Sequence, residues 1–462
     1  MTLHDGRSRF RADIEGLRGV AVLAVVCYHA GLVGWSGGFI GVDVFFVISG
    51  YLITGLLVKE LERTGRVNLR EFFARRIRRL LPASLVVLGA TVAAASLLLS
   101  PGERVTVART ARATAAYASN LYFLVNASDY FASANDLNPL LHTWSLAVEE
   151  QFYLIWPLLL LAAFRGQHRR RALAGLIAMV SVVSLAACVI YTRRNVSWAF
   201  FGTPFRAWEF GAGALVSLVP ATLNVSASVR RSFGVLGTVA IAGSVVLFTR
   251  ATPFPGVAAM LPVAGTTAVL WAGSNPTPRA TRWLQIPPLT AIGRLSYSWY
   301  LWHWPVLVFG AVIWPEPSAA GRIALAAFSL GLATVSYVAV EQPIRLNRRV
   351  SARPRLTIVL AAASSVVWVV GASALRSAAL RDAQAPAQRA IADAERIPGV
   401  YAAHCINDYG DATIHACSSG DPQGRPTVVL FGDSHAAQWA AALDVEARRR
   451  GWRLVLLLKS SC

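Results

Sequence analysis

Long apolar segments separated by short polar ones fill most of this chain of 462 residues. About eleven of them approach the roughly 20 residues that a helix needs to cross the hydrocarbon core of a bilayer. The segments lie near residues 14–33, 39–58, 81–99, 144–164, 172–191, 205–220, 232–249, 257–273, 291–314, 321–341 and 355–375. This pattern predicts an all-α polytopic membrane protein.

One further apolar stretch, inside the loop 100–143, differs from these segments. It runs from Glu103 to Leu124 and contains Arg104, Arg109 and Arg112. Because charged side chains are costly at membrane depth, we expect a surface or re-entrant helix there rather than a span. Counting it as a span would also reverse the topology of everything that follows.

The arginines cluster between the apolar segments and orient the chain. The sequence is 55% hydrophobic and 15% charged, with a formal net charge of +20. The clusters lie in 63–79, 165–171, 230–231, 279–282 and 345–355. With a cytoplasmic N-terminus all of them face the cytoplasm, as the positive-inside rule requires, and only Arg193 and Arg194 fall outside. We expect a multi-pass protein of the cytoplasmic (inner) membrane with an extracytoplasmic C-terminus, contact with the lipid bilayer, and no nucleic-acid partner.

The C-terminal part of the chain changes character. We divide the sequence into a membrane domain (1–350), an additional transmembrane helix (351–376), an extracytoplasmic linker (377–425) and a final segment (426–462). In that segment, residues 426–431 and 453–459 are predicted strands around a helix ending at Arg450, the βαβ start of a parallel α/β domain. About 40 residues cannot bury an adequate core, so we expect a fragment or a truncated gene product.

The chain contains five cysteines. An extracytoplasmic compartment permits disulfides, and a Cys405–Cys417 bridge would close a short loop. Cys462 has no obvious partner, whereas Cys27 and Cys188 lie inside spans and are interpreted as small packing residues.

Five motifs follow one another in the membrane domain. They are Ile14–Ala21 with Tyr28-His29, Gly38–Ile53, Phe73–Pro82, Leu141–Tyr153 and Ser296–Pro305. Together they closely resemble the membrane acyltransferase-3 family over roughly residues 9–345, which implies about ten family helices plus one extra span. Val428–His435 resembles the first block of an SGNH-hydrolase-like domain, a kind of domain fused outside the membrane to a subset of these acyltransferases.

The resemblance implies transfer of an acyl group, usually acetyl, from cytoplasmic acyl-CoA to a hydroxyl of an extracytoplasmic glycan. The resemblance implies acyl-CoA, usually acetyl-CoA, as the donor substrate and a polysaccharide, a glycolipid or peptidoglycan as the acceptor. No metal is expected. The alternative is a transporter or flippase of a glycan or lipid-linked precursor, since buried polar residues also suit a substrate pathway. A third interpretation is a non-catalytic membrane scaffold or sensor, in which Ser434 belongs to a binding module.

His29 and Arg18 lie on the first span, roughly 16 Å apart along a helix. Ionisable groups at membrane depth mark functional pathways by default. His29 suits a general base or a transient acyl carrier, because a neutral imidazole serves both near pH 7; the alternative is a histidine that packs between helices. Arg18 suits binding of a donor phosphate or carbonyl, or else interfacial snorkelling.

Four arginines precede the third span on its cytoplasmic side: Arg75, Arg76, Arg78 and Arg79. Arginine matches phosphate geometry bidentately, so this group suits the phosphates of coenzyme A. Topology determinants have the same composition, which leaves that interpretation open. The family resemblance singles out Arg76 and Arg79.

Glu149 and Glu150 are candidate catalytic carboxylates, because two acids at the start of a span need a polar cavity or cationic partners. Only one of them can face a given direction on a helix. The remaining motif residues assigned to the cavity are Asp43, Ser49, Tyr300 and His303. Asp43 is equally compatible with a span boundary, and His303 with a structural role.

Ser434 is the second catalytic candidate, at the predicted strand-to-helix turn where a hydroxyl lies beside helix N-terminal N–H groups. In the SGNH pattern this serine is the nucleophile. The blocks that supply an oxyanion-hole asparagine and an Asp-x-x-His pair do not occur before Cys462. A serine without a base is a poor nucleophile, and nothing licenses His435 as the substitute, so we expect this site to be incomplete.

Overall fold

The computed structural model describes residues 11–126, 138–163, 169–220, 225–274, 279–386, 388–389, 405–407 and 415–460. The chain divides into two compact units, Met1–Leu380 and Arg381–Cys462. We call them the helical unit and the C-terminal unit and describe each by itself.

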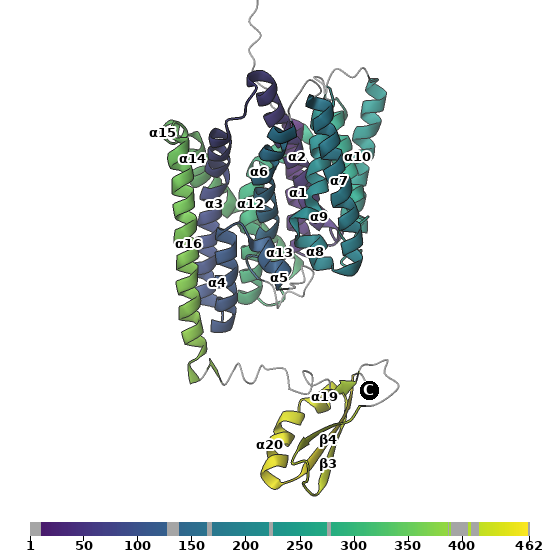
Figure 1. Cartoon of the computed structure of the whole chain (residues 1–462), viewed down its shortest axis with the longest axis vertical. Coiled ribbons are helices and arrows are strands. Elements are labelled where there is room, and N and C mark those ends of the chain that lie inside the picture. Colours follow the sequence, from purple (N-terminus) through teal and green to yellow (C-terminus); the bar gives the residue numbers. More distant parts are fainter. Residues whose placement is uncertain are drawn as a thin grey trace, which may run out of the picture. The chain divides into compact units, whose positions relative to one another are not determined.

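Every predicted span has a helix as its counterpart in the helical unit (Figure 1). These helices are α1 Ala12–His29, α2 Gly41–Thr64, α3 Leu69–Leu98, α6 Thr143–Ala163, α7 Arg169–Arg194, α9 Thr203–Leu218, α10 Ala227–Leu247, α11 Met260–Ala272, α12 Pro287–Ile313, α13 Ala319–Ser336 and α16 Pro354–Ala383. Among the described residues, seven helices are long and apolar enough to cross a membrane by length and composition alone. The predicted polytopic all-α fold is confirmed.

Short helices connect these elements: η1 Gly38–Ile40, α4 Pro101–Ala115, α5 Ser119–Val125, α8 Val196–Phe201, η3 Arg279–Gln285, η4 Tyr337–Glu341, α14 Gln342–Leu346 and α15 Arg348–Ser351. The segment interpreted as a surface or re-entrant helix forms α4 and α5. Ser100 and Glu103 form a capping box at the start of α4, which satisfies the first free N–H groups of that helix. At 15 residues, α4 is shorter than a span.

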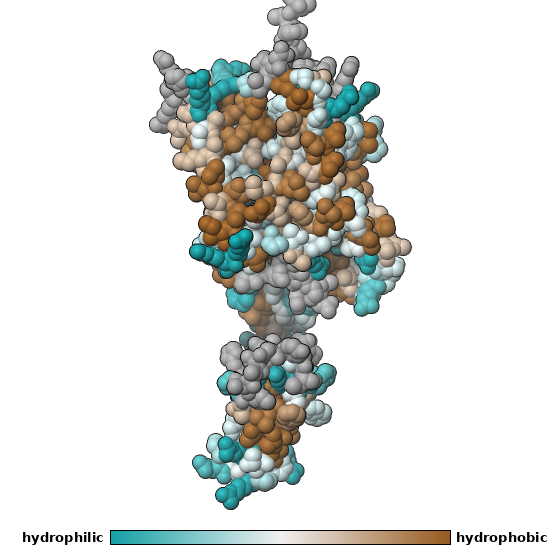
Figure 2. All heavy atoms as spheres, turned by 90° about the vertical axis from the view of Figure 1, so that its right-hand side faces the viewer, coloured by the Kyte–Doolittle hydropathy of each residue, from teal (hydrophilic) through white to brown (hydrophobic). Residues whose placement is uncertain are grey.

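Apolar side chains remain exposed along the flanks of the helical unit, and hydrophilic residues gather toward its two ends (Figure 2). Val182 and Val183 on α7 and Val366 and Val367 on α16 are all more than half exposed. Such exposure is unfavourable in water but suits contact with lipid chains.

Small residues bring α1 directly against α12. A Cβ atom at Gly19 would lie 2.4 Å from the Leu289 carbonyl oxygen, and one at Gly293 would lie 1.8 Å from the Glu15 carbonyl oxygen. Glycine at these two positions therefore permits backbone contact of the kind that stabilises membrane helices. This packing places the polar residues of α1 beside those of α12.

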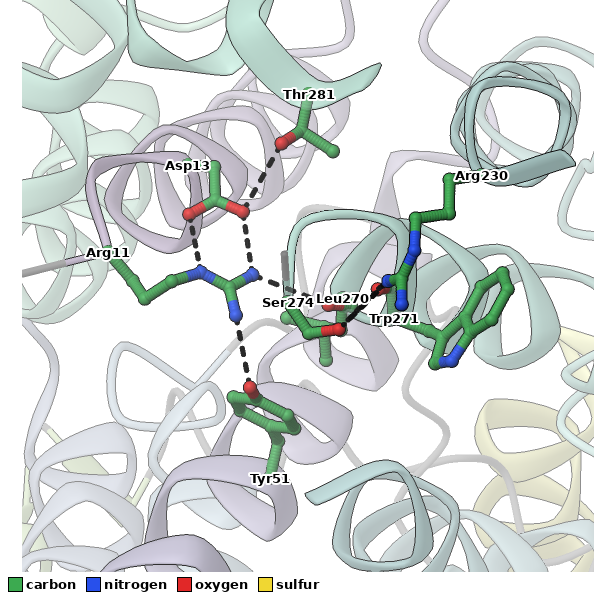
Figure 3. Close-up of polar contacts among 8 residues, drawn as sticks. All are labelled: Arg11, Asp13, Tyr51, Arg230, Leu270, Trp271, Ser274 and Thr281. Atoms are coloured by element: carbon green, nitrogen blue, oxygen red, sulfur yellow. Dashed lines mark hydrogen bonds and ion pairs between the residues drawn. The ribbon is translucent and has the colours of Figure 1, made fainter. Parts of the chain in front are cut away.

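A polar clamp holds the first turn of α1 (Figure 3). The Arg11 guanidinium donates to both carboxylate oxygens of Asp13, at 2.7 and 2.6 Å, and to the Tyr51 hydroxyl at 3.0 Å. It also donates to the Leu270 carbonyl at 3.3 Å, and Thr281 donates to Asp13 at 3.4 Å. The clamp joins α1 to α2, α11 and η3, which fixes the direction in which α1 runs.

The C-terminal unit is a small mixed sheet with helices α19 Ser434–Ala437 and α20 Ala440–Arg450. Strand β3 Thr427–Gly432 pairs in parallel with β4 Arg453–Lys459, as the βαβ prediction requires. Strands β1 Ile406–Asn407 and β2 Cys417–Gly420 also pair with β4, in parallel and antiparallel respectively, and were not predicted. Cys405 and Cys417 form a disulfide, whereas Cys462 lies outside the described residues.

Candidate active site

One cavity in the helical unit collects polar residues from five helices. Its lining includes Arg18 of α1, Ser49 of α2, Arg76 and Arg79 of α3, Ser145, Glu149 and Tyr153 of α6, and Ser296, Tyr297 and Tyr300 of α12. Apolar residues such as Phe45, Leu52 and Leu80 complete the wall, and the cavity volume is about 70 Å³. All five motifs, which are distant from one another in sequence, therefore contribute residues to one cavity.

Glu149 is the polar centre of this cavity. The Ser49 and Tyr153 hydroxyls both donate hydrogen bonds to its carboxylate. The Arg76 guanidinium lies over the Tyr153 ring, 4.6 Å from its centroid. Glu150, the next residue, is outside the described lining, which agrees with the expectation that only one of these carboxylates faces the cavity.

The four arginines of the third motif face different directions. Arg76 and Arg79 line the cavity, as does Arg18, whose guanidinium donates to the Ser296 hydroxyl at 2.8 Å. Arg75 and Arg78 instead form ion pairs with Glu71, at 3.5 and 3.1 Å. The geometry thus separates the group predicted to bind the donor into two arginines at the cavity and two at a carboxylate of their own helix.

Three histidines form a second cluster beside the cavity. His29 Nδ1 lies 2.9 Å from His303 Nε2, and the two ring planes are inclined by 13° with their centroids 5.1 Å apart. His142 meets the His303 ring edge-on at 5.8 Å. Tyr300 separates the cluster from the cavity, because it lines the cavity while its ring lies 5.3 Å from His303. Among the described residues, no three His, Cys, Asp or Glu side chains are placed to hold a metal ion.

His142 was not selected from the sequence. It directly precedes α6 and is 1% exposed, and within the described residues neither of its ring nitrogens forms a hydrogen bond of normal geometry. Its position seven residues before Glu149, in the same motif, was the available signal. A buried imidazole without such a bond is costly to keep, which favours a functional over a packing role.

Asp43 does not line the cavity, contrary to its assignment with Ser49. It forms an ion pair with Arg206 of α9 at 3.0 Å, and Arg206 forms a second one with Glu209 at 3.1 Å. All three side chains are 1% exposed or less, and a buried carboxylate needs a cationic partner. Arg206 and Glu209 were also missed, although ionisable residues inside a predicted span were a signal. His303, too, lies outside the described lining.

The acyltransferase domain family matches residues 11–341 of this sequence. The chain belongs to this acyltransferase family. The match covers all five motifs, the residues that line the cavity and the three clustered histidines. A second family, described as an SGNH domain fused to AT3 domains, matches residues 404–462.

Several curated relatives are similar to this chain over 354 residues, which is 73% of its length. O-acetyltransferase OatA of Staphylococcus aureus is 32% identical, with 57% of its own length covered. Peptidoglycan O-acetyltransferase OatA of Listeria monocytogenes and putative peptidoglycan O-acetyltransferase YrhL of Bacillus subtilis are each 34% identical, with 56% and 55% covered. The chain therefore spans little more than half the length of these relatives. No solved structure matches it.

Within the SGNH-matching part of this chain, Ser434 begins α19, and Asp433 alone separates it from β3. The Asp433 carboxylate accepts a hydrogen bond from the His435 backbone N–H at 2.9 Å, which lowers the pKa of Asp433. The His435 side chain is 85% exposed and faces Asp433 at 3.3 Å. In the described part of this unit no histidine is hydrogen-bonded to the Ser434 hydroxyl, so the geometry supplies it with no base.

Proposed function

We propose that this protein is a membrane O-acyltransferase that moves an acetyl group from acetyl-CoA to a hydroxyl of a cell-wall glycan. Membership of the acyltransferase family and the printed names of the relatives, O-acetyltransferase and peptidoglycan O-acetyltransferase, support the reaction and the acceptor class. The proposal includes a cytoplasmic N-terminus and donor, as the arginine distribution favours.

The observation that carries the proposal is the charge of the cavity lining. Arg18, Arg76 and Arg79 face it, whereas Glu149 is the one carboxylate of the described lining and Glu15 pairs with Arg18 at 3.4 Å from outside that lining, so the wall has an excess of cationic groups. Guanidinium groups bind phosphates with paired hydrogen bonds. A donor that carries several phosphates, such as acetyl-CoA, complements this wall, whereas a neutral glycan does not.

His29 is the proposed reacting group. It is the last residue of α1, eleven residues after Arg18. As a general base it accepts the proton of a glycan hydroxyl while that oxygen attacks the thioester carbonyl; the C–S bond breaks, and the imidazolium returns the proton to the leaving thiolate. As an acyl carrier its ring nitrogen attacks the thioester carbonyl, the C–S bond breaks, and the proton of the other ring nitrogen passes to the thiolate. The glycan hydroxyl oxygen then takes the acetyl group, and the hydroxyl proton returns to the imidazole. Ser434 is proposed to accept the acetyl group before the glycan does, provided that a general base is present beside its hydroxyl.

The test compares the purified wild-type protein with His29→Ala in liposomes that contain acetyl-CoA on one side and a peptidoglycan fragment on the other. We expect acetylated fragment, detected by mass spectrometry, from the wild type and none above background from the variant. Gel filtration and thermal unfolding establish that the variant is folded. Full acetyl transfer by a folded His29→Ala protein would overturn the role of His29, and glycan transport without acetylation would support the transporter alternative.

A further inference from the structure

A second cavity lies against another face of α1. Its lining on α1 consists of Leu17, Val20 and Ala24, whose spacing of three and four residues places them on one stripe of the helix. Arg18, which lines the polar cavity, is rotated by about 100° from Leu17 around the helix axis. The wall formed by α10 runs from Thr238 to Val246. At about 220 Å³ this cavity is larger than the polar one, which measures about 70 Å³.

The space exists because α10 packs against elements other than α1. The Gly37 backbone N–H, just before η1, donates to the Val245 carbonyl at 2.8 Å. A Cβ atom at Gly237 would lie 2.5 Å from the Gly265 carbonyl oxygen of α11, so the backbones of α10 and α11 are in direct contact. With α10 held at these two places, the small side chains along the cavity do not fill the gap to α1.

The walls of this cavity are apolar. Its described lining contains no charged side chain. The Thr238 hydroxyl donates to the Gly234 carbonyl at 2.8 Å and is therefore satisfied within α10. A buried water molecule needs about two to four polar partners, whereas apolar cavities of comparable size take up apolar ligands. The cavity therefore suits a hydrocarbon ligand.

This cavity opens on the lipid-facing flank of α10. Ala242 and Val246 belong to its lining and are both exposed, Val246 to 57%. Val239, one turn before Ala242 and Val246 on the same helix, is 61% exposed. The α1 wall is deep by contrast, since Leu17 and Ala24 are each 2% exposed. These two residues are seven positions apart, or roughly 10 Å along the helix, so the cavity suits an extended chain that enters from the side.

Tryptophans line the cavity at both ends of α1. Trp35 lies beyond the C-terminal end of that helix. Trp283 belongs to η3, where the Leu284 carbonyl oxygen would lie 1.7 Å from a Cβ atom at Gly16, near the start of α1. Tryptophan is enriched where a membrane protein meets the lipid headgroups. The exposed Arg282 directly precedes Trp283, and a guanidinium there suits a headgroup phosphate.

We propose that one acyl chain of a membrane phospholipid binds in this cavity, with the headgroup phosphate at Arg282. A chain of the surrounding bilayer reaches the opening beside Ala242 and Val246 without crossing water. It fills the space between α1 and α10 that their own side chains leave, behind the helix that carries Arg18 and His29.

The test uses the full chain in phosphatidylglycerol liposomes that contain a phosphatidylglycerol analogue with a diazirine in its acyl chain. After illumination, mass spectrometry of peptides locates the label. Because Leu17 and Ala24 are buried, label on this stretch of α1 reports a chain inside the cavity and not the lipid around the protein. We expect such label in the wild type and roughly 10-fold less in Ala242→Trp, whose indole fills the cavity. Val239→Trp adds the same side chain to α10 outside the described lining and should be labelled like the wild type.

Two results of the labelling would overturn the proposal: no label between Leu17 and Ala24 in the wild type, or equal label in the wild type and Ala242→Trp. Should Ala242→Trp fail to fold, Ala24→Phe fills the cavity from α1 instead. Native mass spectrometry of the purified protein identifies the occupant. A retained phospholipid that Ala242→Trp loses supports the proposal, whereas a fatty acid, a polyprenyl phosphate or a second copy of the chain in its place contradicts it.

Discussion

The buried Arg206 and the arginines at the cavity differ in what surrounds them. Arg206 has two carboxylates, Asp43 and Glu209, within 3.1 Å. The rings of Phe46, Trp144, Phe200 and Phe254 also surround its guanidinium, with centroids 5.6–5.9 Å away. The cavity arginines Arg18, Arg76 and Arg79 face the one carboxylate of the described lining, Glu149, and Arg18 also forms an ion pair with Glu15 at 3.4 Å. An arginine at membrane depth is thus no evidence of a binding site by itself; the balance of charge around it decides.

This difference assigns separate tasks to the two sets. Arg206, Asp43 and Glu209 join α2 to α9. The cation–π contacts of Arg206 stabilise its buried positive charge, which water does not solvate. In the proposed function, the excess positive charge of the cavity binds an anionic donor, whereas the two carboxylates beside Arg206 neutralise its charge. We therefore expect variants of the first set to lose the fold and variants of the second to lose donor binding.

The largest effect is expected at Arg206. Arg206→Leu leaves two carboxylates buried without a cation, which typically costs about 3–5 kcal/mol of unfolding free energy. We expect little folded protein, measured as the yield of monodisperse protein in gel filtration and as Tm in detergent. Adding Asp43→Asn and Glu209→Gln to the same variant removes the uncompensated charges and is expected to restore much of the stability. A wild-type Tm for the single variant would contradict the structural role.

A smaller effect, confined to function, is expected at the cavity. Arg76→Ala or Arg79→Ala removes a charge-assisted contact worth about 1.5–3 kcal/mol, so KM for acetyl-CoA should rise roughly 10- to 100-fold at unchanged Tm. Steady-state acetyl transfer at varied donor concentration measures this. Arg75→Ala is the matched control, because its side chain is 45% exposed and paired with Glu71. Equal effects of Arg75→Ala and Arg76→Ala would end the distinction between the two pairs of arginines.

The helices were predictable from the sequence, but the pairing of the arginines was not. Apolar runs report membrane helices because backbone groups in lipid must bond within a helix, and this holds even for short α9 and α11. The ion pair of Arg206 with Asp43 joins positions 163 residues apart, and the contact of His29 with His303 joins positions 274 apart. Such contacts depend on how helices pack, for which hydrophobic periodicity carries no signal.

In the C-terminal unit, too, the sequence predicted the apolar elements but not the contacts between distant segments. Strands β3 and β4 are continuous apolar runs and were predicted within one residue of their ends. Strand β2 has the sequence Cys-Ser-Ser-Gly, and β1 has two residues, so neither has the apolar pattern by which strands are found. Their place beside β4 comes from pairing across the sheet, with the Cys405–Cys417 bridge joining them.

The smallest effect is expected where a charge pair is exposed, at Asp433 and His435. The backbone N–H of His435 holds the pKa of Asp433 below its usual value, so the carboxylate stabilises the folded unit above its unfolded pKa of about 3.9. That contribution is lost as the pH falls through the lower folded pKa.

Because water screens exposed pairs, His435→Ala should leave Tm at pH 7 unchanged within error. Since the backbone bond remains in that variant, only Asp433→Ala should remove the part of the pH dependence below about pH 4 that Asp433 contributes, measured by titrating Tm of the full chain. A large fall in Tm for His435→Ala would show that exposure does not weaken charge pairing here, and would break the contrast with Arg206.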